Sequence, residues 1–254
     1  MQKFSLKGRV AIVTGAARGC GYAFAQGLAE AGADVAIFDI LKTAEEDLTH
    51  LATSYGVTAR AYEVDVTSLA SLQEAFAAVA TDFDGRLDIL VACAGVNKNV
   101  HFLDTDESDF ARLFDVNCKG VYFSAQLAAK AMIQNGTKCG SIILVASIAS
   151  HMAIRSQRST AYCGTKGAVR AMVAPIAAEL HEYGIRVNSV SPGYVRTAMT
   201  APFPELLEGW KDEIMNRRVA EPEDIMGACV FLAGDASRYC TGSDILVDGG
   251  VTKW

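Results

Sequence analysis

The stretch VAIVTGAARGCG, residues 10–21, places a short apolar run directly before three closely spaced glycines. An uninterrupted run of this kind is typical of a strand that is buried on both faces. Glycines after such a strand allow a tight turn, and they let the backbone of the next helix approach a phosphate. A helical pattern closes at Gly32, and residues 34–39 (DVAIFD) form a second apolar run that ends in an acid. This order predicts one strand–helix–strand unit with a nucleotide at its glycine turn.

The same alternation continues along the chain without a linker or a low-complexity segment. Further strands are expected at residues 59–64, 88–92, 141–146, 185–190 and 244–247. Helical patterns cover residues 68–83, 106–134 and 160–183, and a proline at position 222 opens another. We predict an α/β fold in which residues 1–254 form a single domain, a Rossmann-type doubly wound sheet of seven parallel strands with helices on both faces. Ligands of such sheets bind beyond the carboxyl ends of the strands.

Composition argues against several classes of function. The 254 residues are 51% hydrophobic and 20% charged, and the net charge is −6. No basic run stands out, so neither nucleic acid nor an anionic membrane is an expected partner. No signal peptide is expected at the start, and no apolar run reaches the length of a membrane span. The seven cysteines form no CxxC pair, which indicates reduced thiols in a cytoplasmic protein, without a disulfide frame or a metal site.

Tyr162 and Lys166 are four positions apart, so a helix would place both side chains on one face. An ammonium group about 5 Å from a phenol, at an effective dielectric constant of about 20, stabilises the phenolate by about 3 kcal/mol. We therefore expect the phenol pKa to fall from about 10 to about 8 or lower. A phenol of this kind works as an acid or a base near neutral pH.

Several motifs occur together in this chain: Thr14-Gly15-x-x-x-Gly19-x-Gly21, Asp65-Val66, Asn117, Ser147, Tyr162-x-x-x-Lys166 and Pro192-Gly193. In their identity, order and spacing they resemble the short-chain dehydrogenase/reductase family, in its compact single-domain branch, over the whole chain. The runs 147–151 (SIASH) and 187–194 (VNSVSPGY) look most like fungal polyol and ketose reductases. The resemblance implies reversible hydride transfer between a nicotinamide and a small carbonyl or alcohol substrate. It also implies a homo-oligomer, a tetramer or a dimer.

The family's roles fall on matching residues of this chain. The resemblance implies that Tyr162 is the acid or base at the substrate oxygen, and that Lys166 lowers its pKa and holds the nicotinamide ribose. It implies that Ser147 polarises the carbonyl, and that Asn117 kinks its helix so that its carbonyl anchors a water leading from Lys166. The residues implied to bind the cofactor are Gly15, Arg18, Gly19, Cys20, Gly21, Asp39, Ile40, Asp65, Val66, Cys93, Ala94, Gly95, Tyr162, Lys166, Pro192, Gly193, Val195 and Thr197.

The acid at the end of the second strand bears on the choice of cofactor. Asp39 can accept both hydroxyls of an adenosine ribose and repels a 2′-phosphate, which favours NAD(H). Arg18 and Lys42 offer cations to a 2′-phosphate, so NADP(H) stays possible. Asp65 either bonds the adenine amino group or caps its own loop.

One position departs from the family pattern, because Cys93-Ala94-Gly95 stands where the family usually has Asn-Ala-Gly. The asparagine side chain normally ties the central strand ends together, and a thiol cannot replace its donors and acceptors. We expect Ala94 and Gly95 still to face the cofactor through their backbone, with some loss of local rigidity. Cys163 is either packing or a thiol near the nicotinamide.

Substrate selection is expected in residues 93–103, 150–159 and 194–219. The last segment is expected to form a lid, or helices packed on the body, or both. Candidate substrate contacts are His151, Tyr194, Met199 and Phe203. His151, Arg155, Gln157 and Arg158 offer donors to a polyhydroxylated or acidic substrate, or they are solvated loop or subunit contacts.

The expected activity is hydride transfer between NAD(H) and the carbonyl or secondary alcohol carbon of a small substrate such as a polyol or ketose. Two alternatives stay open. One is an NADPH-dependent ketoreductase of secondary metabolism, and the other is a recruited member of the family that binds a cofactor without redox chemistry. Family members that have lost redox activity usually lack the tyrosine or the lysine, whereas Tyr162 and Lys166 are both present here.

Overall fold

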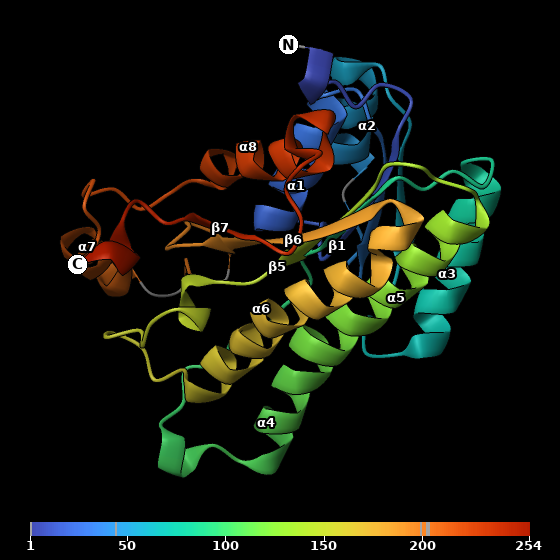
Figure 1. Ribbon diagram of the computed structural model, residues 1–254. Coiled ribbons are helices and arrows are strands. Elements are labelled where there is room, and N and C mark those ends of the chain that lie inside the picture. The colour runs from blue at the N-terminus through green and yellow to red at the C-terminus, as the bar shows by residue number, and fades with distance from the viewer. Residues whose placement is uncertain (1, 44, 199, 202–203) are drawn as a thin grey trace.

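The computed structural model describes residues 2–43, 45–198, 200–201 and 204–254. In this part of the chain, a sheet of seven parallel strands has the order β3-β2-β1-β4-β5-β6-β7 (Figure 1). The strands are β1 Val10–Thr14, β2 Asp34–Asp39, β3 Ala59–Glu63, β4 Ile89–Ala92, β5 Gly140–Val145, β6 Ile185–Pro192 and β7 Asp244–Val247. The predicted doubly wound α/β sheet is confirmed.

Helices cover both faces of this sheet (Figure 1). The helices are α1 Gly19–Glu30, α2 Glu45–Tyr55, α3 Leu69–Asp82, α4 Glu107–Phe114, α5 Val121–Gln134, α6 Thr160–Leu180, α7 Pro204–Glu213 and α8 Pro222–Ala233. α1, α2 and α8 share one core cluster, whereas α3, α5 and α6 share the other. The sequence patterns do not indicate α2, because it is polar along most of its length and Leu51 is its one wholly buried side chain among the described residues.

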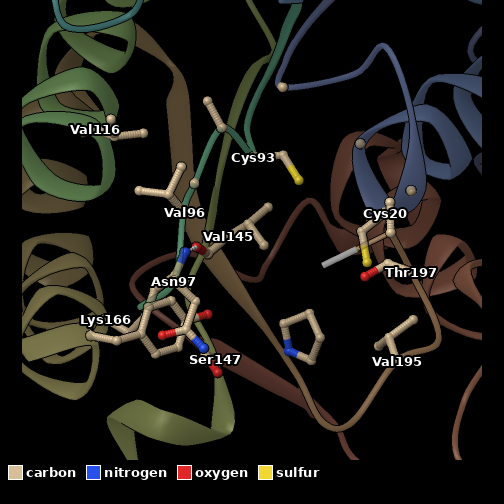
Figure 2. A pocket seen from close by; sticks show the side chains of 18 of the residues that line it. Cys20, Cys93, Val96, Asn97, Val116, Val145, Ser147, Lys166, Val195 and Thr197 are labelled. Carbon is tan, nitrogen blue, oxygen red and sulfur yellow. Dashed lines mark hydrogen bonds between the residues drawn. The ribbon is translucent and has the colours of Figure 1, made fainter. Parts of the chain in front are cut away.

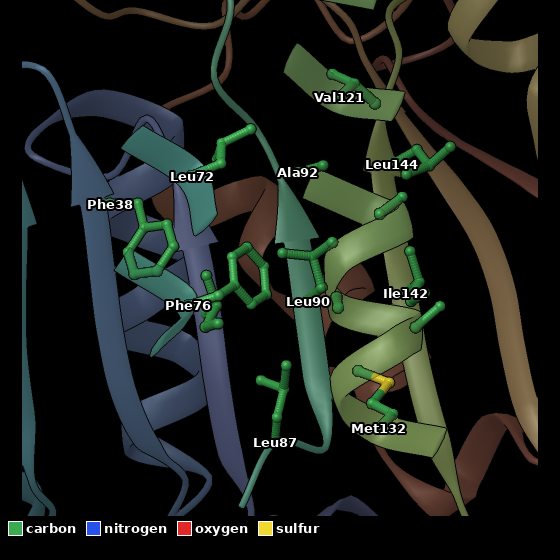
Figure 3. Close-up of a cluster of buried hydrophobic side chains, with 14 of the residues drawn as sticks. Phe38, Leu72, Phe76, Leu87, Leu90, Ala92, Val121, Met132, Ile142 and Leu144 are labelled. Carbon is green, nitrogen blue, oxygen red and sulfur yellow. The ribbon is translucent and has the colours of Figure 1, made fainter. Parts of the chain in front are cut away.

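Successive residues of the central strands point into opposite cores. Val10 and Ile12 of β1 belong to the cluster under α3, α5 and α6, whereas Ala11 and Val13 belong to the cluster under α1 and α8. Figure 3 shows the first cluster, in which Phe38 meets Phe76 edge-on with ring centroids 5.5 Å apart. Each fully buried large side chain contributes about 1.5–3 kcal/mol. Burial on both faces explains why these strands are apolar without interruption.

The long helical pattern at residues 106–134 is interrupted in the structure. A π-helical segment, Asp115–Gly120, joins α4 to α5 and contains Asn117. A Cβ atom on Gly120 would lie 2.8 Å from Cγ2 of Val66, so this segment packs closely on the loop after β3. The local kink expected at Asn117 is therefore a π-helical turn, a feature that is frequent at functional sites.

The strand order reverses between β1 and β4, because the chain leaves β3 at one edge and returns beside β1. Loops after β1 and β4 therefore diverge at their carboxyl ends and leave a crevice, which is where such sheets bind ligands. Within the described residues, none of the helices has both the length and the apolar character needed to cross a bilayer.

Candidate active site

A pocket of about 720 Å³ opens at the carboxyl ends of the strands (Figure 2). Every residue predicted to bind the cofactor lines it, from Gly15 in the turn after β1 to Thr197 after β6. Ser147, Tyr162 and Lys166 line it as well, whereas Asn117 does not. The fold thus brings into one cavity residues that are far apart in the sequence. Gly15 and Thr197, for example, are 182 positions apart.

The glycine turn has the shape that a phosphate-binding turn needs. Gly15 has φ +67°, and a Cβ atom there would lie 2.6 Å from the Cα atom of Ala94 in the loop after β4. A Cβ atom on Gly21 would collide with the carbonyl of Gly15. α1 begins at Gly19, which also has a positive φ, so a helix N-terminus borders the pocket. These residues fit the pyrophosphate of a dinucleotide.

The Asp39 carboxylate is held in place by two backbone donors. Its Oδ2 accepts a hydrogen bond from the Ala17 N–H at 3.0 Å, and its Oδ1 accepts one from the Leu41 N–H at 2.9 Å. Each oxygen of a carboxylate has two acceptor sites, so one on each oxygen stays available. The carboxylate therefore stiffens the glycine turn and still presents acceptors to the pocket that it lines.

Asp65 also lines the pocket, and both readings of it find support. Its Oδ1 accepts hydrogen bonds from the Thr67 N–H at 2.9 Å and the Thr67 hydroxyl at 2.7 Å, so it caps its own loop. No hydrogen bond to its Oδ2 occurs within the described residues. That oxygen leaves an acceptor for a ligand.

The loop after β4 is tied to β1 through the side chain of Thr14. The Thr14 hydroxyl, on a side chain only 1% exposed, accepts hydrogen bonds from the N–H groups of Cys93 and Ala94, each at 3.1 Å. This tie limits the loss of rigidity expected from cysteine at position 93. The Cys93 thiol faces the pocket, and burial raises its pKa to about 12, so it stays protonated and inert near neutral pH.

α6 carries the predicted acid–base pair on the face that turns toward the pocket. The Lys166 side chain is buried, its Nζ donates a hydrogen bond to the Val145 carbonyl at 2.7 Å, and it lies 5.8 Å from the centre of the Tyr162 ring. Ser147 follows β5, and its hydroxyl accepts a hydrogen bond from the Ala149 N–H at 3.1 Å. The serine hydroxyl keeps its proton free for another acceptor.

The prediction that Lys166 lowers the pKa of Tyr162 below its usual value is wrong for this structure. Burial raises the Tyr162 pKa to about 12, and an interaction with the Ser147 side chain only partly offsets this effect. The ring keeps some accessible surface toward the open pocket, but protein surrounds it elsewhere. Burial also lowers the pKa of the Lys166 ammonium. Desolvation of both groups outweighs the attraction between them, and the spacing of Tyr162 and Lys166 in the sequence does not reveal that desolvation.

Asn117 lies beneath the pocket and connects the segments that form it. Its Oδ1 accepts a hydrogen bond from the Val96 N–H at 2.8 Å, and its Nδ2 donates to the Val96 carbonyl at 2.9 Å. Nδ2 also donates to the Thr165 hydroxyl at 3.0 Å, and that hydroxyl donates to the Tyr162 carbonyl at 2.7 Å. One buried side chain thus joins the loop after β4 to the helix of the acid–base pair. The water relay through its carbonyl stays a prediction.

The four predicted substrate contacts have different outcomes. Tyr194 lines the pocket, its ring stacks on Trp210 with centroids 4.3 Å apart, and its hydroxyl donates to Glu213 at 2.7 Å. His151 does not line the pocket, because its Nε2 lies 2.7 Å from Oδ2 of Asp244 at the start of β7. That contact turns the ring toward the sheet edge. Met199 and Phe203 lie outside the described residues.

Some pocket residues were missed or left undecided by the sequence. Asn97 lines the pocket two positions after Gly95. It lies in the segment 93–103 that was expected to select the substrate, but it was not singled out there. Of the four polar residues considered at 151–158, Gln157 alone lines the pocket. Cys163 does not line it and packs in a third apolar cluster with Trp210. Its place in the chain could have indicated Asn97. It follows the strand end at Cys93-Ala94-Gly95, and residues just beyond strand ends face the crevice.

A glycine turn, a ribose-directed acid, and a tyrosine, lysine and serine around one cavity define a class of protein, the dinucleotide-dependent oxidoreductases. A family model described as enoyl-(acyl carrier protein) reductase matches residues 15–252. A sorbose reductase from Schizosaccharomyces pombe is 36% identical over 250 residues, 97% of each chain. A probable NADP-dependent mannitol dehydrogenase from Yarrowia lipolytica is 36% identical over 253 residues, 98% of this chain and 90% of that one.

Among solved structures, a short-chain type dehydrogenase/reductase from Mycobacterium marinum superposes with a TM-score of 0.96 at 36% identity, covering 100% of this chain and 99% of that one. The chain belongs to the short-chain dehydrogenase/reductase family, and it is an NAD(P)-dependent alcohol dehydrogenase or carbonyl reductase. The resemblance stated from the motifs is confirmed.

The raised pKa of Tyr162 can be measured on the protein without cofactor. A phenol whose pKa is about 12 stays protonated at every pH well below that value. We expect the difference in absorbance near 295 nm between the wild type and Tyr162→Phe to show no ionisation step between about pH 6 and about pH 10. Circular dichroism controls for the fold of the variant. An ionisation step near pH 7 or 8 would contradict the burial argument.

Proposed function

We propose that this protein interconverts a ketose and a polyol, or a closely related small polyhydroxylated ketone and alcohol, with NAD(H) as its preferred cofactor. The observation that carries the proposal is that Ser147, Tyr162 and Lys166 line the same pocket as the glycine turn. The names of the sorbose reductase and the mannitol dehydrogenase at 36% identity support the substrate class. The intact tyrosine and lysine argue against a recruited, non-redox role.

In the proposed mechanism the residues around the carbonyl handle the oxygen and its proton. Bound NAD(H) would supply the hydride in reduction and accept it in oxidation. The Ser147 hydroxyl donates a hydrogen bond to the substrate oxygen and polarises the C=O bond. The Tyr162 hydroxyl, protonated at neutral pH because burial raises its pKa to about 12, gives its proton to the developing alkoxide. In oxidation the same oxygen takes the proton back.

Lys166 has two tasks in this scheme. Its Nζ uses one donor on the Val145 carbonyl, at 2.7 Å, which leaves two donors for a nicotinamide ribose. Its positive charge stabilises a Tyr162 phenolate and so aids proton transfer in both directions.

The preference for NAD(H) rests on Asp39. Its carboxylate has free acceptor sites that suit ribose hydroxyls, and its negative charge opposes a 2′-phosphate. NADP(H) is the second candidate, and a specific observation favours it. Arg18 also lines the pocket, its guanidinium has no hydrogen bond or ion pair within the described residues, and a relative at 36% identity is named NADP-dependent.

A lid over the substrate end, formed by residues 194–219 of a single catalytic domain, is part of the proposal. α7 supports this role through Trp210, which is 1% exposed, lines the pocket and donates from Nε1 to the Ser156 hydroxyl at 2.9 Å. The stacked Tyr194 and Trp210 rings would cover the carbon chain of a bound substrate. Apolar packing and lid function are compatible, because the same face of α7 serves both.

Tyr162→Phe tests the acid–base role. Because the variant loses the proton-transferring oxygen, we expect kcat for ketose reduction to fall by more than about a hundredfold. Binding of NADH, followed by its fluorescence, should stay within about twofold, since the ring remains. Tyr239→Phe is the matched control, because the Tyr239 side chain is fully exposed. Unchanged turnover in Tyr162→Phe would remove the catalytic assignment.

Asp39→Asn tests the cofactor preference by removing charge while keeping size and one acceptor. We expect the ratio of kcat/KM for NADH to that for NADPH to fall by about tenfold or more, because repulsion of the 2′-phosphate is lost. Asp39→Ala should lower the ratio at least as far, and Asp82→Asn, remote from the pocket, should leave it unchanged. A wild type that already prefers NADPH strongly would contradict the role given to Asp39.

We also propose that the protein is a cytoplasmic homo-oligomer, a tetramer or a dimer. All seven cysteines are free, which suits a reducing compartment. Phe102, Leu103 and Phe110 are 69%, 80% and 48% exposed, an apolar area that a second copy could cover. We expect light scattering to give two or four times the 27.0 kDa of one chain, and Phe110→Asp to reduce that mass. A monomer at micromolar concentration would refute this proposal.

A further inference from the structure

Two side-chain amides in the pocket have no hydrogen-bond partner in the part of the chain that the structure describes. Asn97 and Gln157 both line the pocket, and neither carboxamide is hydrogen-bonded within the described residues. The Asn97 Oδ1 is one of three side-chain atoms there that are buried without a partner. The other two, Thr43 Oγ1 and Ser124 Oγ, belong to residues that do not line the pocket.

A buried polar atom without a partner is costly, so the Asn97 Oδ1 needs a reason. Gln157 is only partly buried, so water can bond to its amide when no ligand is bound. A buried polar group without a partner loses about 1–3 kcal/mol relative to water. Asn117 and Asn188, the buried asparagines, are fully engaged by comparison, each with donors and acceptors paired at 2.8–3.1 Å. The Asn97 carboxamide therefore resembles a group that a ligand completes rather than one that shapes the core. The Gln157 carboxamide lines the same pocket and is available to the same ligand.

Both amides are carried by segments that are fixed in position and linked to each other. Asn117 holds Val96, the neighbour of Asn97, through its N–H and its carbonyl. Asn99 Oδ1 accepts a hydrogen bond from the Arg158 N–H at 2.7 Å, and the Val100 N–H donates to the Arg158 carbonyl at 2.9 Å. The segment of Asn97 is thus tied to the residue that follows Gln157, and little ordering is left for a ligand to impose.

The two amides belong to the catalytic part of the pocket. Figure 2 shows the Asn97 carboxamide in the region of Ser147 and Lys166, apart from Cys20 and Thr197 of the cofactor turn and the β6 loop. Gln157 lies next in sequence to Ser156, whose hydroxyl accepts the hydrogen bond from Trp210. Ile154 and Trp210, both buried, add apolar surface to the same pocket.

We propose that Asn97 and Gln157 bind hydroxyl groups of the substrate that flank its reacting carbon, and that they select polyhydroxylated chains over plain ketones and alcohols. A carboxamide both donates and accepts, and so does a hydroxyl, so the pair matches in either orientation of the amide. A carboxylate or an ammonium ligand would use only half of this capacity. The inference rests on the proposed function, because it assigns residues to the selection of that substrate.

The test compares two six-carbon 2-ketones that differ in their hydroxyl groups, L-sorbose and 2-hexanone. Asn97→Leu and Gln157→Met remove the amides at nearly constant volume. We expect each variant to lower kcat/KM for L-sorbose by about fivefold to tenfold, and to change kcat/KM for 2-hexanone by less than about twofold. Gln73→Met, an exposed amide on α3 outside the pocket, is the matched control and should change neither.

Each outcome decides between the two proposals. An equal fall for both ketones would mean that the amides only support the pocket. No fall for either ketone would mean that the amides do not touch the substrate. Both results overturn the inference and leave the proposed function standing.

If the wild type reduces neither ketone, the proposed function fails. Calorimetric titration of D-mannitol into the NADH complex then still tests the amides. Binding that weakens about fivefold in Asn97→Leu supports the inference, and absent or unchanged binding overturns it.

Discussion

The hydrogen bonds of Asn117 are the constraint on which the rest of the site depends. Its side chain holds both backbone groups of Val96 and reaches the Thr165 hydroxyl, which in turn donates to the Tyr162 carbonyl. This arrangement requires the π-helical segment Asp115–Gly120, because the segment places a polar side chain between a loop and a helix that meet at the pocket. A single buried amide thereby fixes the distance between the cofactor side and the catalytic side of one cavity.

Burial shapes the pKa values of the ionisable groups in this site as strongly as the closeness of other charges does. Lys166 lies close to Tyr162, but the lysine is buried and the tyrosine partly buried, and desolvation raises the pKa of the phenol while it lowers that of the ammonium. A protonated phenol is the form needed to reduce a carbonyl. The same low-dielectric surroundings raise the pKa of the Cys20 thiol to about 11 and that of Cys93 to about 12, so the thiols beside the catalytic residues stay neutral.

The substrate end of the pocket combines an apolar wall with unpaired polar groups. Trp210 and Tyr194 stack face to face, and the Trp210 Nε1 and the Tyr194 hydroxyl each have a protein partner, so their rings offer apolar faces only. Asn97 and Gln157 supply donors and acceptors that no described residue of the chain uses. A chain of carbons bearing hydroxyl groups satisfies both kinds of surface at once, which links the specificity proposed here to the packing of α7.

The sequence by itself determined the order of the strands and helices along the chain and the glycine turn, and it singled out Ser147, Tyr162 and Lys166, which line the pocket. Period, turn chemistry and motif spacing are local properties of the chain. It did not indicate α2, which has too little apolar surface to show a pattern. Tertiary structure alone decided the pKa of Tyr162, the hydrogen bonds that tie Thr14 to the loop after β4, and the turning of His151 to Asp244. It also decided that Asn97 and Gln157 share a pocket. Each of these depends on which distant groups surround a side chain, and burial and partners of that kind arise only when separate segments pack together.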